Sequence, residues 1–294
     1  MNGFVADPVQ AEQKTMLTRR KFLLGSAAAA GGLAIYSSGH ARHEISVETQ
    51  DLALANLPDA FRGYRIAQIS DIHFDEYTEG WFVRRVVGEV NRLAPDLVLL
   101  TGDYISNTPK GQNFAAGAML RCAAELRRLT CPLRYASMGN HDSFLGPPLI
   151  RAGLASASIP MLFNQHVAIE RNGQRIWLAG LADTISNVPN LHLAIPSNPD
   201  GPVILMCHEP DYADNVLEQG FGGRVDVMLS GHSHGGQVRL PVIGALKVPD
   251  GGRKYVQGLF RLGQMQLYVN RGIGTVGLPF RLNCPPEITL FTLR

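Results

Sequence analysis

Cysteine is scarce in this 294-residue sequence, which contains four, and no two of them form a C-x-x-C pair. The chain therefore lacks the cysteine spacing of structural zinc sites and dithiol redox motifs. Cys207 lies in an apolar strand pattern, where a buried thiol is the usual explanation. In an exported protein a pair such as Cys122 and Cys131 could form a disulfide, and the sequence leaves that question open.

Uneven charge is also absent. No block of like charge, Ser/Gly-rich linker or internal repeat divides the chain, so one folded domain is the simpler interpretation. Lysine and arginine do not cluster, and this argues against a nucleic-acid surface. Residues 1–41 hold four of the 27 basic and two of the 25 acidic side chains, so the remainder of the chain is formally neutral.

No apolar run reaches the ~20 residues needed for a confident membrane span. The weakly apolar run from Leu23 to Tyr36 follows the twin arginine Arg19-Arg20. Basic residues, an apolar stretch and small residues in this order are typical of an export signal, and the twin arginine indicates the twin-arginine (Tat) route. Gly39-His40-Ala41 offers a cleavage site after Ala41.

We therefore predict an export signal over residues 1–41, disordered or helical, that is recognised by the twin-arginine export machinery. Residues 42–294 would then form a single domain in the periplasm or on the outer face of the cytoplasmic membrane. An uncleaved segment that anchors the chain in the membrane is the alternative, and it leaves peripheral membrane contact open.

Strand and helix patterns alternate along the first half of the chain. Apolar residues at helical spacing predict helices over residues 81–93, 114–129 and 147–157. Short apolar runs predict strands over residues 64–69, 96–100, 134–138, 203–207, 225–229, 266–270 and 288–293. Residues 166–181 alternate around Asn172-Gly173, which is a strong hairpin signal. This order indicates an α/β fold in which two packed mixed β-sheets are flanked by helices.

Five of the apolar runs end in clusters of aspartate, asparagine and histidine. The clusters are Asp71-Ile72-His73, Gly102-Asp103, Gly139-Asn140-His141-Asp142, His208 and Gly231-His232-Ser233-His234. In open α/β sheets the ligand crevice lies beyond the carboxyl ends of the strands, so these clusters can converge. Imidazoles and carboxylates are common ligands of zinc, iron and similar metals.

Each cluster alone has an ordinary explanation. Asp71 could cap a helix or turn, Gly102-Asp103 could be a simple turn, and His208 could be a hydrogen-bonded core histidine. Their joint occurrence, in order and each at a strand end, favours a shared metal site instead. Converging carboxylates and imidazoles at a partly buried edge would be costly without cations to pair them.

The motifs D-x-H, G-D, G-N-H-D, a single H and G-H-x-H, in that order, resemble the calcineurin-like metallophosphoesterase superfamily over about residues 64–240. The stretches from Gly235 to Pro241 and from Arg271 to Gly274, with Pro286-Glu287-Ile288, are further similar to the bacterial YaeI-type phosphodiesterase branch. That branch includes exported members and relatives that hydrolyse UDP-2,3-diacylglucosamine. The resemblance implies a four-layer α-β-β-α sandwich.

The resemblance also implies two divalent metal ions with Asp103 as the bridging ligand. One ion would be held by Asp71, His73, Asp103 and His234, and the other by Asp103, Asn140, His208 and His232. Mixed nitrogen and oxygen ligands suit Mn²⁺, Fe or Zn²⁺ and do not single one out. Two such ions about 3.5–4 Å apart can clamp a phosphoryl group and activate a water molecule as nucleophile.

Catalytic and substrate-binding roles follow from the same resemblance. His141 is the best candidate to protonate the leaving oxygen, with Asp142 or Asp103 orienting its ring, and a purely supporting hydrogen bond is the alternative. Arg239 and Arg271 are candidates for binding a substrate phosphate, with an ordinary ion pair as the alternative for each.

Two features bear on the substrate. Protein Ser/Thr phosphatases of this superfamily carry an Asp-Arg pair after the G-D motif, whereas this chain has Ser106-Asn107, so a protein-phosphatase activity is disfavoured. Leu278-Pro279-Phe280 lies in a Gly/Pro-rich loop and could form an apolar lip for an acyl chain, although closing a core is the commoner role for such residues.

We therefore predict a hydrolase that cleaves a phosphodiester or pyrophosphate bond, on a substrate that could be lipid-linked, such as UDP-2,3-diacylglucosamine. A general phosphomonoesterase is the alternative enzyme. A non-catalytic metal-binding module of the cell envelope is the alternative from a different class, and the complete ligand set together with His141 argues against it.

Overall fold

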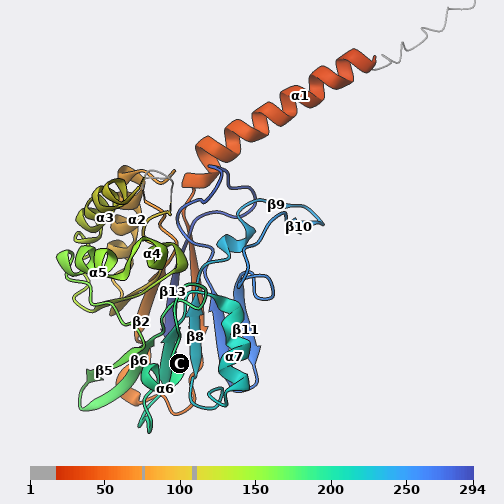
Figure 1. The fold of residues 1–294 in the computed structure, drawn as a ribbon. Helices are drawn as coiled ribbons and strands as arrows, with labels where there is room; N and C mark the ends of the chain where they lie inside the picture. Colours follow the sequence, from red (N-terminus) through yellow and green to blue (C-terminus); the bar gives the residue numbers. More distant parts are fainter. Residues whose placement is uncertain (1–17, 75–76, 108–110) are drawn as a thin grey trace, which may run out of the picture.

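Two β-sheets form the centre of the computed structural model, which describes residues 18–74, 77–107 and 111–294 (Figure 1). The first sheet has the order β1-β13-β2-β3-β4. Its strands are Ser46–Leu52 (β1), Glu287–Leu293 (β13), Arg65–Ile69 (β2), Leu97–Thr101 (β3) and Arg134–Ser137 (β4). β2, β3 and β4 are parallel, whereas β13 runs antiparallel to β2 and parallel to β1.

The second sheet has the order β11-β12-β8-β7-β6-β5. Its strands are Gly258–Leu262 (β11), Met265–Val269 (β12), Val227–Ser230 (β8), Val203–Met206 (β7), Gln174–Gly180 (β6) and Gln165–Arg171 (β5). The four central strands are parallel, and the two edge strands pair antiparallel with their neighbours. Both sheets are therefore mixed, as predicted. A separate two-stranded ribbon joins Arg239–Leu240 (β9) and Gly244–Ala245 (β10).

Helices pack on the outer face of each sheet and complete four layers. The helices over the first sheet are Gly80–Leu93 (α2), Gln112–Leu126 (α3), Asn140–Leu145 (α4) and Pro147–Ser156 (α5). Their apolar side chains share one buried cluster with side chains of β2 and β3. Leu191–Ala194 (α6) and Ala213–Glu218 (α7) contribute to another cluster with β7 and β12. Figure 1 shows α2, α3 and α5 on one side of the sheets and α7 on the other.

The strand β3 shows why the central strands are continuous apolar runs. Leu97 and Leu99 enter the buried cluster between the two sheets, whereas Val98 and Leu100 enter the cluster under the helices. Successive side chains of a strand point to opposite faces, so a strand covered on both faces has no polar side. The alternation that marks a half-buried strand is therefore missing from β3.

The predicted elements are confirmed with small changes in their ends, and the hairpin turns at Asn172-Gly173. Both turn residues have positive φ, 52° and 75°, as the two-residue hairpin turn requires. The sequence interpretation missed the edge strands β1 and β11, the ribbon of β9 and β10, and the short helices α4, α6 and α7. β1 reads Ser-Val-Glu-Thr-Gln-Asp-Leu and is only partly buried, so its pairing with β13 rather than its composition makes it a strand.

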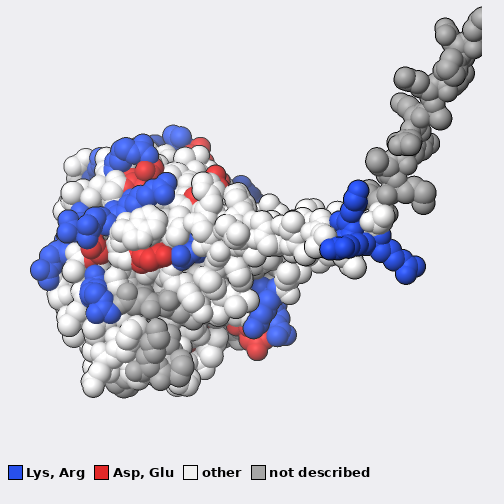
Figure 2. All heavy atoms as spheres, turned by 90° about the horizontal axis from the view of Figure 1, so that it is seen from above, with Lys and Arg blue, Asp and Glu red and all other residues white. Residues whose placement is uncertain are grey.

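The described part of the predicted signal is helical. The helix α1 (Arg19–Ile35) continues through a π-helical turn (Tyr36–His40) and a 3-10 turn (Ala41–His43) into the domain. The whole stretch Arg19–His43 is the one described helix that is long and apolar enough to cross a membrane by length and composition. Figure 2 shows it as an uncharged rod with lysine and arginine at its far end. Residues 1–17 of the predicted signal lie outside the described residues.

The four cysteines are buried thiols in this fold. Cys122 lies in α3 and Cys131 follows it, while Cys207 directly follows β7, as its apolar surroundings in the sequence indicated. Burial raises the pKa of the Cys207 thiol well above its usual value, which favours the unreactive protonated form.

The inter-sheet core gives the first testable prediction. Leu99→Ala removes a fully buried side chain between the sheets, so we expect a loss of about 2–5 kcal/mol in the free energy of unfolding by urea denaturation. Leu120→Ala is the matched control on α3, because Leu120 is 63% exposed and should change the stability by about 0.5 kcal/mol or less. Equal losses in the two variants would contradict the described core.

Candidate metal centre

Five loops bring aspartate, asparagine and histidine side chains to one edge of the stacked sheets. The loops follow β2, β3, β4, β7 and β8, the same strand ends that carry the clusters predicted from the sequence. Parallel strands of one sheet end at the same edge, so their loops meet there. His73 and His234 are 161 positions apart in the chain, yet their Nε2 atoms are 3.1 Å apart.

Five of the seven predicted ligands have a left-handed backbone conformation, which residues other than glycine rarely adopt. Their φ angles are 51° at Asp71, 46° at His73, 57° at Asp103, 67° at His232 and 51° at His234. Each such residue costs on the order of 1–3 kcal/mol and persists only where the surrounding structure enforces it. The surrounding structure therefore holds these five residues in an unfavourable backbone conformation, and this conformation sets where their side chains lie.

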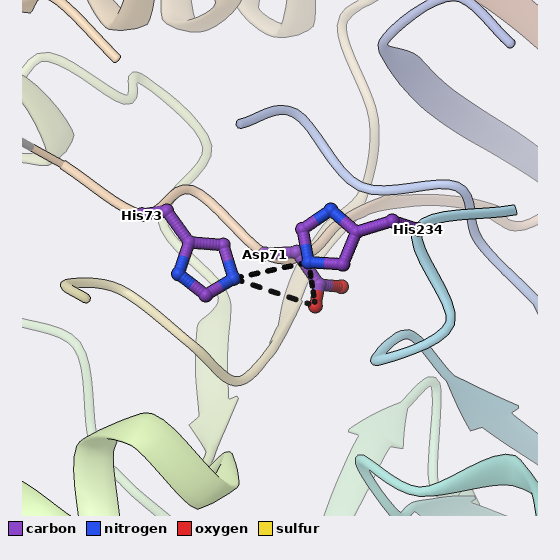
Figure 3. A group of neighbouring side chains, drawn as sticks. All are labelled: Asp71, His73 and His234. Atoms are coloured by element: carbon purple, nitrogen blue, oxygen red, sulfur yellow. Dashed lines mark hydrogen bonds and ion pairs between the residues drawn. The ribbon is translucent and has the colours of Figure 1, made fainter. Parts of the chain in front are cut away.

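The first group of candidate ligands comprises Asp71, His73 and His234 (Figure 3). Nε2 of His234 lies 3.3 Å from Oδ1 of Asp71, and Nε2 of His73 lies 4.0 Å from the same oxygen. All three side chains are buried. One ligand atom of each residue therefore faces a common point, which is the arrangement that a metal ion requires.

The second group comprises Asp103, His208 and His232, whose ligand atoms all lie within 4.8 Å of one another. Oδ2 of Asp103 is 3.2 Å from Nε2 of His208 and 3.5 Å from Nε2 of His73. The same carboxylate oxygen therefore contacts one imidazole from each group. This is the place that a bridging ligand would occupy.

Asn140, the remaining predicted ligand, follows β4 and has a buried side-chain oxygen. Its Oδ1 atom is buried and has no hydrogen-bond partner among the described residues. A buried carbonyl oxygen without a partner is costly, and binding a cation would remove that cost. Together with the two groups, this oxygen completes a donor set of carboxylates, imidazoles and one amide that fits a pair of divalent cations.

Glycines in the motifs allow the loops to approach one another closely. A Cβ atom on Gly139 would lie 2.2 Å from Oδ1 of Asp103, and one on Gly231 would lie 2.2 Å from Oδ2 of Asp71. Both positions must therefore lack a side chain if the two carboxylates are to keep their places. The glycines of G-N-H-D and G-H-x-H thus serve the packing of the site.

Hydrogen bonds on the far side of three imidazoles fix the direction of their rings. Nδ1 of His73 is 3.0 Å from Oγ of Ser106, and Nδ1 of His208 is 2.6 Å from the carbonyl oxygen of Thr101. Each of these contacts leaves Nε2 directed at the centre. In His232 the roles are reversed, because Nε2 is 2.7 Å from the carbonyl oxygen of Asp250. Such outer contacts are typical of metal-ligating histidines.

Burial governs the electrostatics of the centre. It lowers the pKa of His73 to about 3 and that of His232 to about 4, so both rings are neutral at pH 7 and keep a lone pair for a metal. It raises the pKa of Asp71 to about 6. Burial also opposes ionisation of Asp103, but the nearby His208 and His141 outweigh it and hold the pKa of this carboxyl well below its usual value.

Comparison with known proteins identifies this arrangement. A family model for calcineurin-like phosphoesterases matches residues 64–236. The chain belongs to this family. It is 32% identical over 289 residues to the metallophosphoesterase YkuE of Bacillus subtilis, which covers 95% of this chain and 98% of that protein. The phosphodiesterase YaeI of Escherichia coli is 31% identical, over 95% of this chain and 100% of that protein.

A third relative has a named lipid substrate. The UDP-2,3-diacylglucosamine pyrophosphatase LpxG of Chlamydia trachomatis is 29% identical over 301 residues, 80% of this chain and 86% of that protein. The family and its named activities make this chain a metallophosphoesterase, a hydrolase that acts on phosphoric ester bonds. The predicted fold, family and enzyme class are thereby confirmed.

In this metallophosphoesterase, His141 lies beside both groups of ligands. Its backbone N–H donates to Oδ1 of Asp103 over 2.9 Å, and its Nδ1 accepts from the backbone N–H of Asn107 over 2.9 Å. A neutral imidazole that accepts at Nδ1 carries its proton at Nε2. The contact with Asn107 therefore favours the tautomer of His141 that has its N–H at Nε2, where it can donate a hydrogen bond.

The positions that depart from the protein-phosphatase pattern have their own roles here. Oγ of Ser106 contacts the ring of His73, and the backbone N–H of Asn107 contacts the ring of His141. The sequence identified Ser106-Asn107 only as a missing Asp-Arg pair. Every residue except proline has a backbone N–H, so the residue type at position 107 could not indicate this contact, and the orientation of His141 was not predictable from sequence.

The structure corrects the role predicted for Asp142. Its buried carboxylate accepts from the backbone N–H groups of Asp103 (2.7 Å), Tyr104 (2.9 Å) and Gly139 (3.1 Å), and not from the ring of His141. Burial, followed by repulsion from Asp103, raises the pKa of Asp142 well above its usual value. Asp142 therefore ties together the two loops that carry Asp103 and Asn140.

The structure also places both predicted substrate arginines in internal contacts. Arg271 forms ion pairs with Glu287 and Glu48, and its side chain is largely buried. Nη1 of Arg239 donates to the carbonyl oxygen of Gly235 over 2.8 Å. The ordinary ion pair, which was the alternative for Arg271, matches its position, and the substrate-binding role of Arg239 stays a prediction.

The bridging position of Asp103 gives a second prediction. Mn²⁺ should raise the melting temperature of the wild-type protein, because a ligand that binds only the folded state stabilises it. Asp103→Asn should remove most of that rise, since the amide keeps the shape but not the charge between the two groups. Asp59→Asn, at an exposed carboxylate, is the matched control and should respond to Mn²⁺ like the wild type. A normal Mn²⁺ response in Asp103→Asn would refute the bridging assignment.

The corrected role of Asp142 gives a third prediction. Asp142→Asn replaces one accepting oxygen by a donor NH₂ against backbone N–H groups, so the loops of Asp103 and Asn140 should shift. We expect the Kd for Mn²⁺, measured by isothermal titration, to rise by about 10–100-fold. If Asp142→Asn instead leaves the Kd unchanged and alters the pH dependence of turnover in the same way as a substitution of His141, the predicted role of Asp142 in orienting the His141 ring would be supported.

Proposed function

We propose that this metallophosphoesterase hydrolyses a phosphodiester or pyrophosphate bond with two divalent cations, of manganese, iron or zinc, held at the described centre. The observation that carries the proposal is the position of Asp103, whose Oδ2 lies between His73 of one ligand group and His208 of the other. Asp71 and His234 would complete one cation site, and Asn140 and His232 the other. When bound, the cations would supply an activated nucleophile and positive charge for the phosphoryl oxygens.

The proposed part of His141 is to protonate the leaving oxygen. Asn107 holds the ring at Nδ1, and the backbone N–H of His141 is fixed by Asp103, so the residue is oriented against the ligand groups. The ring centroids of His141 and His73 are 4.8 Å apart. This proximity would place Nε2 of His141 beside the ester oxygen of a substrate that is bound between the ligand groups. The proton would come from the imidazolium form of the ring, which carries a proton at Nδ1 as well and so gives up the contact with Asn107.

The substrate class that we propose is a diester or pyrophosphate linked to a lipid. YaeI is named for phosphodiester cleavage and LpxG for cleavage of a pyrophosphate in a diacylated nucleotide sugar. The exposed side chain of Leu278, in the loop that the sequence identified as an apolar lip, supports an acyl-bearing substrate. The positive charge of the proposed cations suits a phosphoryl group, and the apolar loop around Leu278 suits an acyl chain.

We further propose that the chain is exported by the twin-arginine machinery and works in the periplasm or on the outer face of the cytoplasmic membrane. The twin arginine Arg19-Arg20 stands at the start of an exposed apolar helix, α1, that leads into the domain. Basic residues on the amino-terminal side of a span stay in the cytoplasm, which would leave the domain outside.

His141→Ala tests the proposed function. Turnover of bis-nitrophenyl phosphate with Mn²⁺ should fall about 10²–10⁴-fold, because the leaving group loses its proton donor, while the metal content stays that of the wild type. His166→Ala is the matched control, since His166 is exposed on β5, and its turnover should be unchanged. A faster rate with the diester than with nitrophenyl phosphate is expected, and the reverse preference would favour a phosphomonoesterase.

Two results would contradict this assignment. Unchanged turnover in His141→Ala would remove the residue from the reaction. Loss of metal in the same variant would make His141 a ligand, a role that its position beside His73 and Asp103 also permits.

A further inference from the structure

Four large apolar side chains project into solvent from the β9–β10 hairpin, the residue after it and a loop whose backbone is hydrogen-bonded to Gln237. Relative exposures are 107% for Val242, 70% for Ile243, 57% for Leu246 and 61% for Leu278. We call these four residues the apolar patch. Val242 and Ile243 form the turn between β9 and β10, Leu246 follows β10, and Leu278 belongs to the Gly/Pro-rich loop over residues 276–283. Such a gathering of exposed apolar side chains indicates a contact surface.

The backbone at Val242 adds a second, independent observation. Its φ angle is 68°, in the left-handed region that β-branched residues rarely adopt. Glycine or asparagine would fit this turn position without strain. A fully exposed valine buries no apolar surface in the folded domain, and its strained backbone costs stability. A valine at this position is therefore better explained by contact with an apolar environment outside the domain.

Hydrogen bonds join the apolar patch to the base of α1. The side chain of Gln237, just before β9, donates to the carbonyl oxygens of Val276 (3.3 Å) and Leu278 (2.9 Å). The backbone N–H of Arg281, in the same loop, donates to the carbonyl oxygen of Ser37 over 3.1 Å. Figure 1 accordingly shows the β9–β10 hairpin and α1 at one end of the molecule and the β5–β6 hairpin at the other.

The base of α1 is built into the domain rather than tethered loosely to it. Ser37 and Ala41 are buried, and the guanidinium of Arg42 donates to Glu79 and to the carbonyl oxygen of Tyr77. These contacts include the predicted cleavage position after Ala41. The described fold therefore contains α1 as a fixed element, which fits a retained anchor better than a removed signal.

The uncharged exposed stretch at the amino-terminal side of the domain is shorter than the hydrocarbon core of a bilayer, so a span leaves no distance between the membrane and the domain. Residues 18 to 36 are all exposed, and the uncharged stretch among them, from Phe22 to Tyr36, has a length of about 22 Å at 1.5 Å per residue. The hydrocarbon core of a bilayer is about 30 Å thick. A short span draws the flanking protein into the membrane interface, and the flanking surface here carries the apolar patch.

We propose that the apolar patch inserts into the interface of a phospholipid bilayer that α1 spans, as a second membrane contact. Arg19, Arg20 and Lys21 at the far end of α1 would lie on the cytoplasmic side. The ligand His234 and the β9–β10 hairpin are separated by only a few residues, and a Cβ on Gly236 would lie 2.2 Å from Cβ of Ala245. Insertion of the hairpin therefore sets the metal centre beside the lipid headgroups. This last consequence rests on the proposed function.

A fluorescent label tests the contact directly. The four native cysteines are buried, so the full-length variant Ile243→Cys can be labelled with an environment-sensitive NBD dye at one exposed thiol. In vesicles of phosphatidylethanolamine and phosphatidylglycerol, we expect the dye to shift to shorter wavelength and to be quenched by lipids with a nitroxide on the acyl chain. Val188→Cys is the matched control, because Val188 is apolar and 82% exposed but lies outside the patch.

Two outcomes would overturn the proposal. A dye at position 243 that stays as hydrated and as unquenched as the dye at position 188 would place the apolar patch in water. A wavelength shift that follows the protein-to-lipid ratio without nitroxide quenching would show that a second copy of the chain, and not lipid, covers the patch.

An activity measurement connects the contact to the substrate. The double variant Val242→Ser with Ile243→Ser should hydrolyse soluble bis-nitrophenyl phosphate like the wild type. Its turnover of a diacylated nucleotide-sugar pyrophosphate embedded in the same vesicles should fall about tenfold or more, the factor expected for losing the burial of one or two such side chains. Equal turnover of the embedded substrate would refute the link to catalysis. Failure of the wild type to hydrolyse any phosphoester would refute the proposed function, while the fluorescence result would still decide the membrane contact.

Discussion

The buried carboxylates of Asp71 and Asp103 set the central constraint on this protein. Both are buried, with a carboxylate oxygen 3.2 Å from an imidazole nitrogen at Asp103 and 3.3 Å from one at Asp71. Buried ionised groups need positive charge to pair with. Burial keeps His73 and His232 neutral, so these two rings supply none of that charge, whereas Asp103 and Asp71 overcome burial and raise the pKa of His208 well above its usual value. Divalent cations would satisfy the carboxylates, the imidazole lone pairs and the oxygen of Asn140 that lacks a partner. The metal chemistry of the family is therefore also the condition under which this edge of the fold is electrostatically satisfied.

The two-sheet scaffold is what allows such an edge to exist. Left-handed backbone at Asp71, His73 and Asp103 is unfavourable in isolation, and the loops keep it because the strands below them are fixed on both faces by apolar packing. Short contacts across Gly139 and Gly231 show that the loops are pressed together rather than merely adjacent. The packed strands fix the positions of the loops, and the strained loops fix the directions of the candidate ligand atoms, so a cation would meet a preformed site.

One chain segment serves both the metal centre and the surface around it. The turn that carries His234 leads directly into the β9–β10 hairpin, and the loop that accepts hydrogen bonds from Gln237 also contacts the base of α1 through Arg281. Buried Arg281 donates to several backbone carbonyls of this region and so holds the loop in shape. A displacement of this surface can therefore reach the candidate ligands through few bonds, whereas the β5–β6 hairpin lies at the other end of the molecule (Figure 1).

The sequence by itself determined the central strands, the helices α2, α3 and α5, and the polar clusters that meet at the candidate metal centre, because apolar periodicity and short polar motifs are local signals. It could not supply β1, a polar edge strand whose only reason to be extended is its pairing with β13. It also could not assign Asp142, which binds backbone N–H groups of a loop 38 and 39 positions away, or Arg271, which Glu48 and Glu287 withdraw from solvent. Tertiary structure decided these roles, because a hydrogen bond or ion pair depends on which segments meet and not on the residue type alone.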